Sequence, residues 1–272
     1  MSEEAEVTIS YLILCHDSPD RIVRLATRIL SDDETGQVVI HFDKNSSRAK
    51  FNELKARLHG TSRCHILKHR VRCGWGQWSL VEASLRMLKE ANNKFKTRYY
   101  YLLSEFCYPV QALNKLKLFL SKSNNCNYME CEGSNWIKGG IREDRVLYRH
   151  FLNKRKYPKA HRYLYKVQKK LKIKKNISEK ITIKYGSQWW CLANPTVEYV
   201  LANHQKYISI FKYSWIPDES FFQTVVFSMP IACRHISNYT LTKYEFDSKG
   251  NPIIIRDPRI YHPKYYFCRK IL

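Results

Sequence analysis

The chain lacks several patterns that would assign it to a common class. No window of its 272 residues approaches 18 uninterrupted apolar residues, so the sequence predicts no membrane-spanning helix. No Gly-x-Gly-x-x-Gly run follows the first apolar segment, which disfavours a dinucleotide-dependent oxidoreductase, and no P-loop occurs either. Residues 1–6 are acidic, whereas a signal peptide would be basic and then apolar. We therefore expect a chain that starts in a soluble compartment.

Metal-binding motifs are also missing. There is no Asp-x-Asp, and Ser31–Glu34 reads as a turn between two elements. No Cys-x-x-Cys pair supports a zinc site at Cys64, His65, His69 and Cys73. The nine cysteines are odd in number and scattered, with several inside apolar runs, so they read as small buried side chains in a reducing compartment. The sequence predicts no metal and no disulfide framework.

Acidic residues are scarce, and the charge is uneven. The chain has 24 Asp and Glu against 47 Lys and Arg, a net charge of +23. Residues 154–180 hold 12 Lys or Arg and one acid, Glu179. Tyr163, Leu164, Val167 and Leu171 recur there at helical spacing, which predicts a basic amphipathic helix. Such a helix is a solvated face, a nucleic-acid patch or a contact for anionic lipid, and without a nucleic-acid-binding motif we disfavour the second.

Apolar patterning predicts an α/β fold. Strand patterns alternate with helix patterns through the first half of the chain, which calls for a mostly parallel central sheet flanked by helices. In the second half we expect a strand followed by two helices. The expected strands are 7–15, 37–42, 64–67, 99–104 and 184–193; the expected helices are 19–30, 47–58, 79–91, 114–121, 195–202 and 218–227.

The ends of these strands carry polar side chains. Ligands of parallel sheets bind at the carboxyl ends of the strands. This rule places His16, Asp43, Ser104 and the loop before Trp75 around one crevice. The loop also holds Gly76, whose neighbourhood offers backbone N–H groups to a phosphate, although Trp75 is equally suited to a hydrophobic core.

The segment 213–226 places two carboxylates between a proline turn and an apolar run. Pro217 pre-sets a turn, and Asp218 is predicted to be the N-cap of the helix that follows. Glu219 would lie in the first helical turn, where the helix dipole favours its ionised form. An ionised carboxylate at a rigid helix start is suited to act as a general base, but the same residues also serve as ordinary caps.

Seven segments occur in the order of one known family. The chain resembles the core-2/I-branching β-1,6-N-acetylglucosaminyltransferases and the related peptide O-xylosyltransferases, as a soluble member of bacterial type. The matching segments are 11–16, 39–46, 75–83, 99–110, 186–192, 217–222 and 267–270.

The resemblance implies a GT-A-like nucleotide-sugar-binding fold and an inverting transfer from a UDP-sugar, with Glu219 as the base. It favours N-acetylglucosamine as the donor sugar and xylose second. The family does without a metal and binds the diphosphate with basic side chains near the C-terminus. Lys270 and Arg269 match these residues, and Arg256 is a less secure third. Arg and Lys neutralise phosphate charge directly.

Further site residues follow from the same resemblance. Asp43, in a His-x-Asp-Lys motif, is expected to recognise uracil, because a carboxylate accepts the imide hydrogen. His16, Trp75, Gly76 and Ser104 join the donor side. The residues expected on the sugar and acceptor side are Ser187, Gln188, Trp189, Asp218 and Glu105.

One departure from the family pattern affects the site. Where relatives read Ser-Gly-x-Asp, this chain has Ser104-Glu105-Phe106-Cys107. Cys107 therefore replaces an acid. Three interpretations stay open: the enzyme uses a different sugar, Glu105 replaces the lost carboxylate, or the activity is weak. The alternative to an enzyme is a catalytically silent glycan-binding or membrane-associated protein that keeps the fold.

The expected organisation is a single domain over residues 1–272, with a nucleotide-binding half (1–125) and an acceptor and catalytic half (126–272) that contains the basic insertion 154–180. The expected partners are a UDP-sugar, a glycan acceptor that is lipid-linked in one hypothesis, and an anionic membrane at the inner face of the cell membrane, with no nucleic acid. The expected location is cytoplasmic.

Overall fold

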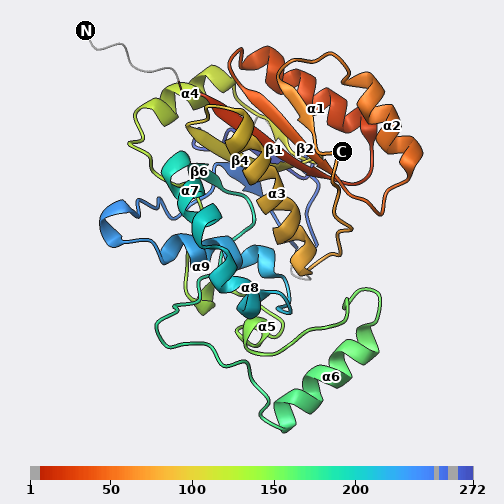
Figure 1. Cartoon of the computed structure of the whole chain (residues 1–272), viewed down its shortest axis with the longest axis vertical. Helices are drawn as coiled ribbons and strands as arrows, with labels where there is room; N and C mark the ends of the chain where they lie inside the picture. The colour runs from red at the N-terminus through yellow and green to blue at the C-terminus, as the bar shows by residue number, and fades with distance from the viewer. Residues whose placement is uncertain (1–6, 248–250, 257–262, 272) are drawn as a thin grey trace.

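The computed structural model describes residues 7–247, 251–256 and 263–271. A five-stranded sheet in the order β3-β2-β1-β4-β6 forms its centre (Figure 1). The central strand β1 runs parallel to β2 and β4, β2 runs parallel to β3, and β6 is antiparallel to β4. The strands are β1 (Ile9–Cys15), β2 (Gln37–Phe42), β3 (Cys64–Ile66), β4 (Tyr99–Ser104) and β6 (Cys191–Ala193).

Strand β1 is buried on both faces because successive side chains point to opposite sides of the sheet. Ile9, Tyr11 and Ile13 enter one hydrophobic core, and Leu12 enters the other. This two-sided burial explains why the strand reads as an almost continuous apolar run.

Helices cover both faces of the sheet. The first core packs against α1 (Pro19–Asp32), α2 (Arg48–Arg57) and α4 (Leu113–Ser121). The second packs against α3 (Trp78–Lys94), α7 (Asn194–Asn203), α8 (Gln205–Phe211) and α9 (Phe221–Phe227). The predicted α/β class, with a mostly parallel central sheet flanked by helices, is confirmed, and every strand and helix expected before residue 122 is present within a few residues of its predicted bounds.

A second, three-stranded sheet brings the C-terminal segment to the carboxyl end of β4. Its order is β5-β8-β7, with β5 (Tyr108–Pro109), β8 (Phe267–Arg269) and β7 (Thr242–Tyr244). The Ile271 N–H donates to the Phe106 carbonyl at 2.9 Å. The basic end of the chain is therefore next to the loop that follows Ser104.

Two predicted elements of the second half are wrong in extent. Of the strand expected over 184–193, only β6 is regular, and Tyr185 makes an isolated bridge to Glu132. The segment between them leaves the ladder because Gly186 lies against the backbone of Glu130, where a side chain would clash. Gly186 N–H instead donates to the carbonyl of Glu219 at 3.0 Å.

The helix expected over 218–227 is split. Residues Pro217–Glu219 form a separate 3-10 turn, η2, and α9 begins at Phe221 after Ser220. Asp218 is therefore not the N-cap of α9, contrary to prediction. The break arises because Ser220 has an extended φ of −149°, so the helical hydrogen bonds restart there.

Residues 134–180, which lie between α4 and β6 in the chain, form a long excursion that holds the predicted basic helix. It contains η1 (Ser134–Trp136), α5 (Asp144–Leu147) and α6 (Pro158–Lys170), and α6 lies at the end of the molecule away from the sheet (Figure 1). A last 3-10 turn, η3, spans Ile231–Cys233. No helix in the described ranges is both long enough and apolar enough to cross a bilayer. All nine cysteines are described, and all are free thiols.

Candidate active site

The carboxyl ends of three parallel strands meet at one edge of the sheet. His16 follows β1, Asp43 follows β2, and Ser104 ends β4. Asp43 N–H donates to the Cys15 carbonyl at 2.8 Å, and its Oδ1 accepts from the N–H groups of Asn45 and Cys73 at 2.8 and 3.0 Å. The structure therefore brings together the ends of β1 and β2 and the loop before Trp75, as the strand-end rule predicted.

Glu105 organises the loop after β1. Its carboxylate is buried and accepts hydrogen bonds from the N–H groups of His16, Asp17 and Ser18 and lies 2.8 Å from His16 Nδ1. Burial acts to raise the pKa of Glu105, but these hydrogen bonds outweigh it and hold the pKa below its usual value. The same contact raises the pKa of His16. Glu105 thus fixes an exposed imidazole at the sheet edge.

Cys107 occupies a dry position in the same loop. Its side chain is buried, and the Ser104 N–H donates to its Sγ at 3.3 Å. Burial raises the pKa of the thiol, so it is uncharged at neutral pH. Position 107 therefore carries no charge, and the neighbouring Glu105 carries the carboxylate of this loop.

Glu219 forms an ion pair with a buried arginine. Arg145 Nη1 of α5 donates to Glu219 Oε2 at 2.8 Å, and the Glu219 side chain is only partly exposed. Burial raises the pKa of the Glu219 carboxyl, and the positive charge of Arg145 opposes that rise. The pair holds a carboxylate in one orientation while keeping its proton affinity above that of a free glutamate.

Two backbone hydrogen bonds fix the turn that carries Glu219. Ile216 adopts a left-handed conformation, with φ 53°, and its N–H donates to the Gly76 carbonyl at 2.9 Å. Trp215 N–H donates to the Arg145 carbonyl at 2.7 Å. Gly76 is required here, since a Cβ would lie 2.9 Å from the Trp215 ring and φ is 66°. The Trp75–Gly76 loop therefore supports the carboxylate turn.

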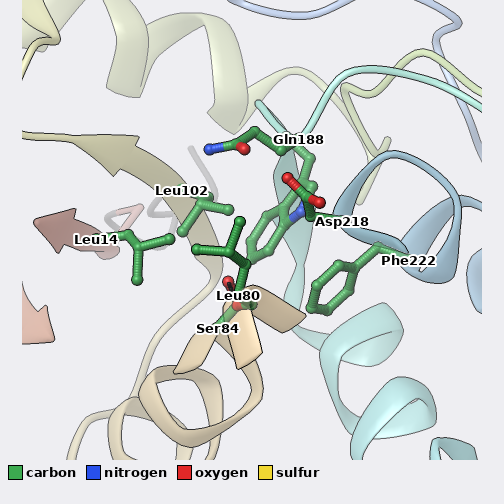
Figure 2. Close-up of a pocket in the computed structure, with 8 residues that line it drawn as sticks. Leu14, Leu80, Ser84, Leu102, Gln188, Asp218 and Phe222 are labelled. Atoms are coloured by element: carbon green, nitrogen blue, oxygen red, sulfur yellow. Dashed lines mark hydrogen bonds between the residues drawn. The ribbon is translucent and has the colours of Figure 1, made fainter. Parts of the chain in front are cut away.

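Asp218 faces a small pocket beside Glu219. Oδ1 is buried without a hydrogen-bond partner, and the pKa of the carboxyl is raised to about 7 by burial and by the neighbouring Glu219. The pocket lies between the ends of β1 and β4, helix α3 and the η2–α9 segment (Figure 2). Its lining is mostly apolar: Leu14, Leu80, Ser84, Leu102, Gln188, Trp190, Asp218 and Phe222.

A second carboxylate lies on the other side of the Gly186–Trp189 segment. Glu130 Oε2 accepts from the Ser187 N–H at 2.9 Å and from the Tyr244 hydroxyl at 2.7 Å. Its negative charge contributes to the raised pKa of Glu219. The structure thus places Ser187 against the Glu130 carboxylate, while Gln188 lines the pocket together with Asp218, and these polar groups are suited to hydroxyl contacts.

The C-terminal basic residues lie over aromatic rings. The guanidinium of Arg269 is 4.7 Å from the centroid of the buried Trp189, and Lys270 Nζ is 4.6 Å from that of Phe106. Within the described ranges no carboxylate lies within ion-pair distance of Arg269, and its buried Nε has no partner. Trp189 is therefore a support for Arg269. Arg256 is exposed and follows Ile255, whose N–H donates to the Lys270 carbonyl.

Trp75, predicted for the donor side, contacts residues of later segments in the chain. Its half-exposed ring packs edge-on against Trp215 with centroids 5.0 Å apart, and the Arg155 guanidinium covers it at 3.8 Å. These contacts join the loop before α3 to the excursion that carries α6.

Three residues of the site went unnoticed in the sequence: Arg145, Glu130 and Tyr244. Arg145 stands in a polar stretch without periodicity, and Glu130 and Tyr244 belong to no recognised motif. Only their distance from Glu219 and Ser187 identifies them, and this distance is a property of the folded chain.

Comparison with known proteins agrees with this architecture. The family described as Core-2/I-Branching enzyme matches residues 9–269, and the chain belongs to this family.

Curated relatives include "Xylosyltransferase 2" of Rattus norvegicus, 24% identical over 251 residues, which cover 89% of this chain and 27% of the relative. "Xylosyltransferase" of Ciona intestinalis is 23% identical and is matched over 81% of this chain and 25% of its own length. The chain thus spans about a quarter of these relatives. Among solved structures, the galactosyltransferase LgtC in complex with donor and acceptor sugar analogues aligns with a TM-score of 0.40 at 10% identity, over 77% of this chain and 68% of that one.

Proposed function

We propose that the chain is an inverting glycosyltransferase that moves a sugar from a UDP-sugar to a glycan hydroxyl without a metal. The Glu219–Arg145 pair carries this proposal, because it presents an oriented carboxylate of raised pKa among polar groups at the carboxyl edge of the sheet. A general base is most effective when its pKa is close to the working pH.

The transfer needs one base. The acceptor hydroxyl oxygen attacks the anomeric carbon as the bond from that carbon to the diphosphate oxygen breaks, and its proton passes to the Glu219 carboxylate. The bonding pair leaves with UDP. Because the hydroxyl attacks from the face opposite the diphosphate, the sugar's anomeric configuration inverts. Arg145 keeps Glu219 ionised before the attack, since it lowers the proton affinity that burial raises.

The leaving group needs positive charge. Arg269 and Lys270 are on the short sheet that adjoins the end of β4, and they are the cations we assign to the diphosphate. Arg269 has no carboxylate partner in the described part of the chain, so its charge is available to a ligand. On the nucleotide side we assign Asp43 to the uracil, with His16 and Ser104 beside it.

N-acetylglucosamine is the first donor sugar that we propose and xylose the second. The family supports the former, and the names of the curated relatives support the latter. Ser187, Gln188 and Asp218 are the residues that we assign to the transferred sugar and the acceptor, because they line the pocket or the segment beside it.

The test is UDP release in the presence of EDTA. UDP-N-acetylglucosamine, UDP-xylose, UDP-glucose and UDP-galactose are offered singly, with a panel of glycan acceptors, to the wild-type protein and to Glu219→Gln. We expect turnover of one donor that survives EDTA and collapses in the variant. Turnover that requires a divalent cation would refute the metal-independent mechanism, and binding of no UDP-sugar at all would refute the function.

A further inference from the structure

Helix α6 lies at the end of the molecule away from the sheet (Figure 1), and large apolar side chains on it and next to it are exposed. Six of the thirteen exposed large hydrophobic side chains among the described residues lie between residues 151 and 173. Tyr163 is 68% and Leu171 61% exposed. A solvated helix face would carry polar residues at these positions, so the apolar residues need another explanation.

One side of α6 is already used in folding. His161 is buried and stacks on His150 with ring centroids 5.0 Å apart. The Tyr165 hydroxyl donates to Asp144 of α5 at 2.5 Å, and Gln168 Nε2 donates to the Arg149 carbonyl at 2.9 Å. These contacts fix the orientation of the helix, so its other sides face outward in a defined way.

The remaining surface divides into an apolar and a basic sector. At about 100° per residue, Ala160, Tyr163, Leu164, Val167 and Leu171 fill a sector about 100° wide next to the packed side. Lys159, Arg162, Lys166 and Lys170 fill the adjoining sector. An apolar stripe bordered by lysines is the pattern of a helix that lies in the plane of a membrane surface.

The charge of the segment that contains α6 indicates what kind of surface it contacts. Residues 154–180 contain 12 Lys or Arg and a single acid. Anionic lipid attracts such a segment and accepts its apolar side chains below the headgroups, which nucleic acid does not. Contacts within the protein already occupy the packed side of α6. A partner that encloses a helix would need that side as well, whereas a flat membrane surface needs only the side that faces outward.

We propose that α6 is a docking surface for an anionic lipid bilayer. Tyr163, Leu164 and Leu171 insert between the lipids, and Lys166 and Lys170 contact the headgroups. The docking site joins the candidate active site through α5, since Asp144 contacts Tyr165 of α6 while Arg145 contacts Glu219. The docked protein therefore presents its site to acceptors near the membrane surface.

Vesicle flotation tests the proposal with the 272-residue chain. Vesicles of phosphatidylcholine alone are compared with vesicles that also contain phosphatidylglycerol, at low and high salt. Wild type should float with the anionic vesicles at least about tenfold more than with the neutral ones, and high salt should weaken the effect. Equal recovery with both vesicle types at low salt would overturn the proposal.

Two double variants separate the apolar and the basic contributions. Tyr163→Ser/Leu171→Ser and Lys166→Glu/Lys170→Glu should each lose about tenfold in binding to anionic vesicles, because both sectors act together. Matched controls of similar exposure elsewhere are Leu118→Ser/Ile231→Ser and Lys115→Glu/Lys122→Glu, which should bind as wild type does.

The same variants show whether α6 binds something other than lipid, and each such result overturns the proposal. Indifference to lipid together with a concentration-dependent dimer that Tyr163→Ser/Leu171→Ser abolishes would identify a second copy of the chain. Indifference to lipid together with RNA binding that Lys166→Glu/Lys170→Glu abolishes would identify nucleic acid. UDP release with a water-soluble acceptor should be the same for all these variants, which separates docking from catalysis.

Discussion

Arg145 and Glu219 are 74 residues apart in the sequence, and their side chains meet at 2.8 Å. The arginine is buried, and its carbonyl on the short helix α5 also accepts a hydrogen bond from the Trp215 N–H, just before the turn that carries Glu219. The pair couples the excursion between residues 134 and 180 to the carboxylate that we propose as the base. Its charge balance sets the pH range in which that base is ionised.

Glu219→Gln should lower turnover about 10²- to 10⁴-fold, because a neutral amide of nearly the same shape cannot accept the acceptor's proton. Binding of the UDP-sugar should remain, since Glu219 is not assigned to the nucleotide. Steady-state kinetics and calorimetric titration with the donor measure both. Glu143→Gln, on the surface beside Arg142, is the control and should leave turnover unchanged. Full activity of Glu219→Gln would exclude Glu219 as the base.

Arg145→Met should move the acidic limb of the pH–rate profile to higher pH. Arg145 lowers the pKa of Glu219, so without it the carboxyl holds its proton to a higher pH, and activity near neutrality falls but returns in part at alkaline pH. Arg145→Lys keeps the charge and should restore the limb, and Arg142→Met, on an exposed arginine, should not move it. An unshifted limb in a folded Arg145→Met protein would show that the pair does not set the ionisation.

Arg269→Met should raise KM for the UDP-sugar about 10- to 100-fold, the value of one charge-assisted contact to the diphosphate. The measurement is donor saturation in the presence of EDTA. Arg234→Met is a matched control, because Arg234 also covers an aromatic ring, that of Phe227 at 3.9 Å, outside the site. An unchanged KM in Arg269→Met would assign the diphosphate to other side chains.

The wild-type protein should lose stability as the pH rises, and Asp218→Asn should remove this loss. The pKa of Asp218 is raised to about 7 in the folded state. The stability that this carboxyl contributes is therefore fully present below its pKa in the unfolded state and is lost as the pH rises through 7. Between pH 5 and pH 8 the wild type should therefore lose about 2 kcal/mol relative to the variant. Urea unfolding at the two pH values measures the difference, and parallel curves would contradict it.

For Lys175 we expect the opposite dependence of stability on pH. It is buried, and its Nζ donates to the Ile210 carbonyl at 2.7 Å and to Ser214 Oγ at 2.9 Å. Burial lowers its pKa to about 7, so the unfolded chain binds more protons between pH 7 and the ordinary lysine value, and stability rises with pH across that window.

The gain from pH 7 to pH 9 should be about 2 kcal/mol larger in wild type than in Lys175→Met. Lys174→Met, at the exposed neighbouring position, is the control and should follow wild type. A gain that is the same in Lys175→Met as in wild type would show that Lys175 keeps its ordinary pKa.

The first half of the fold was predictable because local patterns there agree with the tertiary structure. Strand β1 and helix α1 each bury the side chains that their periodicity marks, and Ser18 and Ser47 cap the helices that follow them. The strand-end rule then placed His16, Asp43 and Ser104 at one edge without further information.

The second half was less predictable because long-range contacts override local propensity. Pro217 and the acidic pair read as a helix start, yet Gly76 and Arg145 hold the segment as a separate 3-10 turn, and Asp218 becomes a buried, unpaired carboxyl. The spacing of the apolar residues of α6 predicted a basic amphipathic helix, but only the structure shows which of its side chains are packed and which are exposed.

The sequence by itself determined the alternating α/β order, the strand ends and the family motifs, because each depends on residues close together along the chain. Only the tertiary structure decided which cation faces Glu219, which carboxylate orders the His16 loop and which face of α6 stays open. These depend on contacts between segments tens of residues apart, and their energies come from burial and charge separation that no local pattern records.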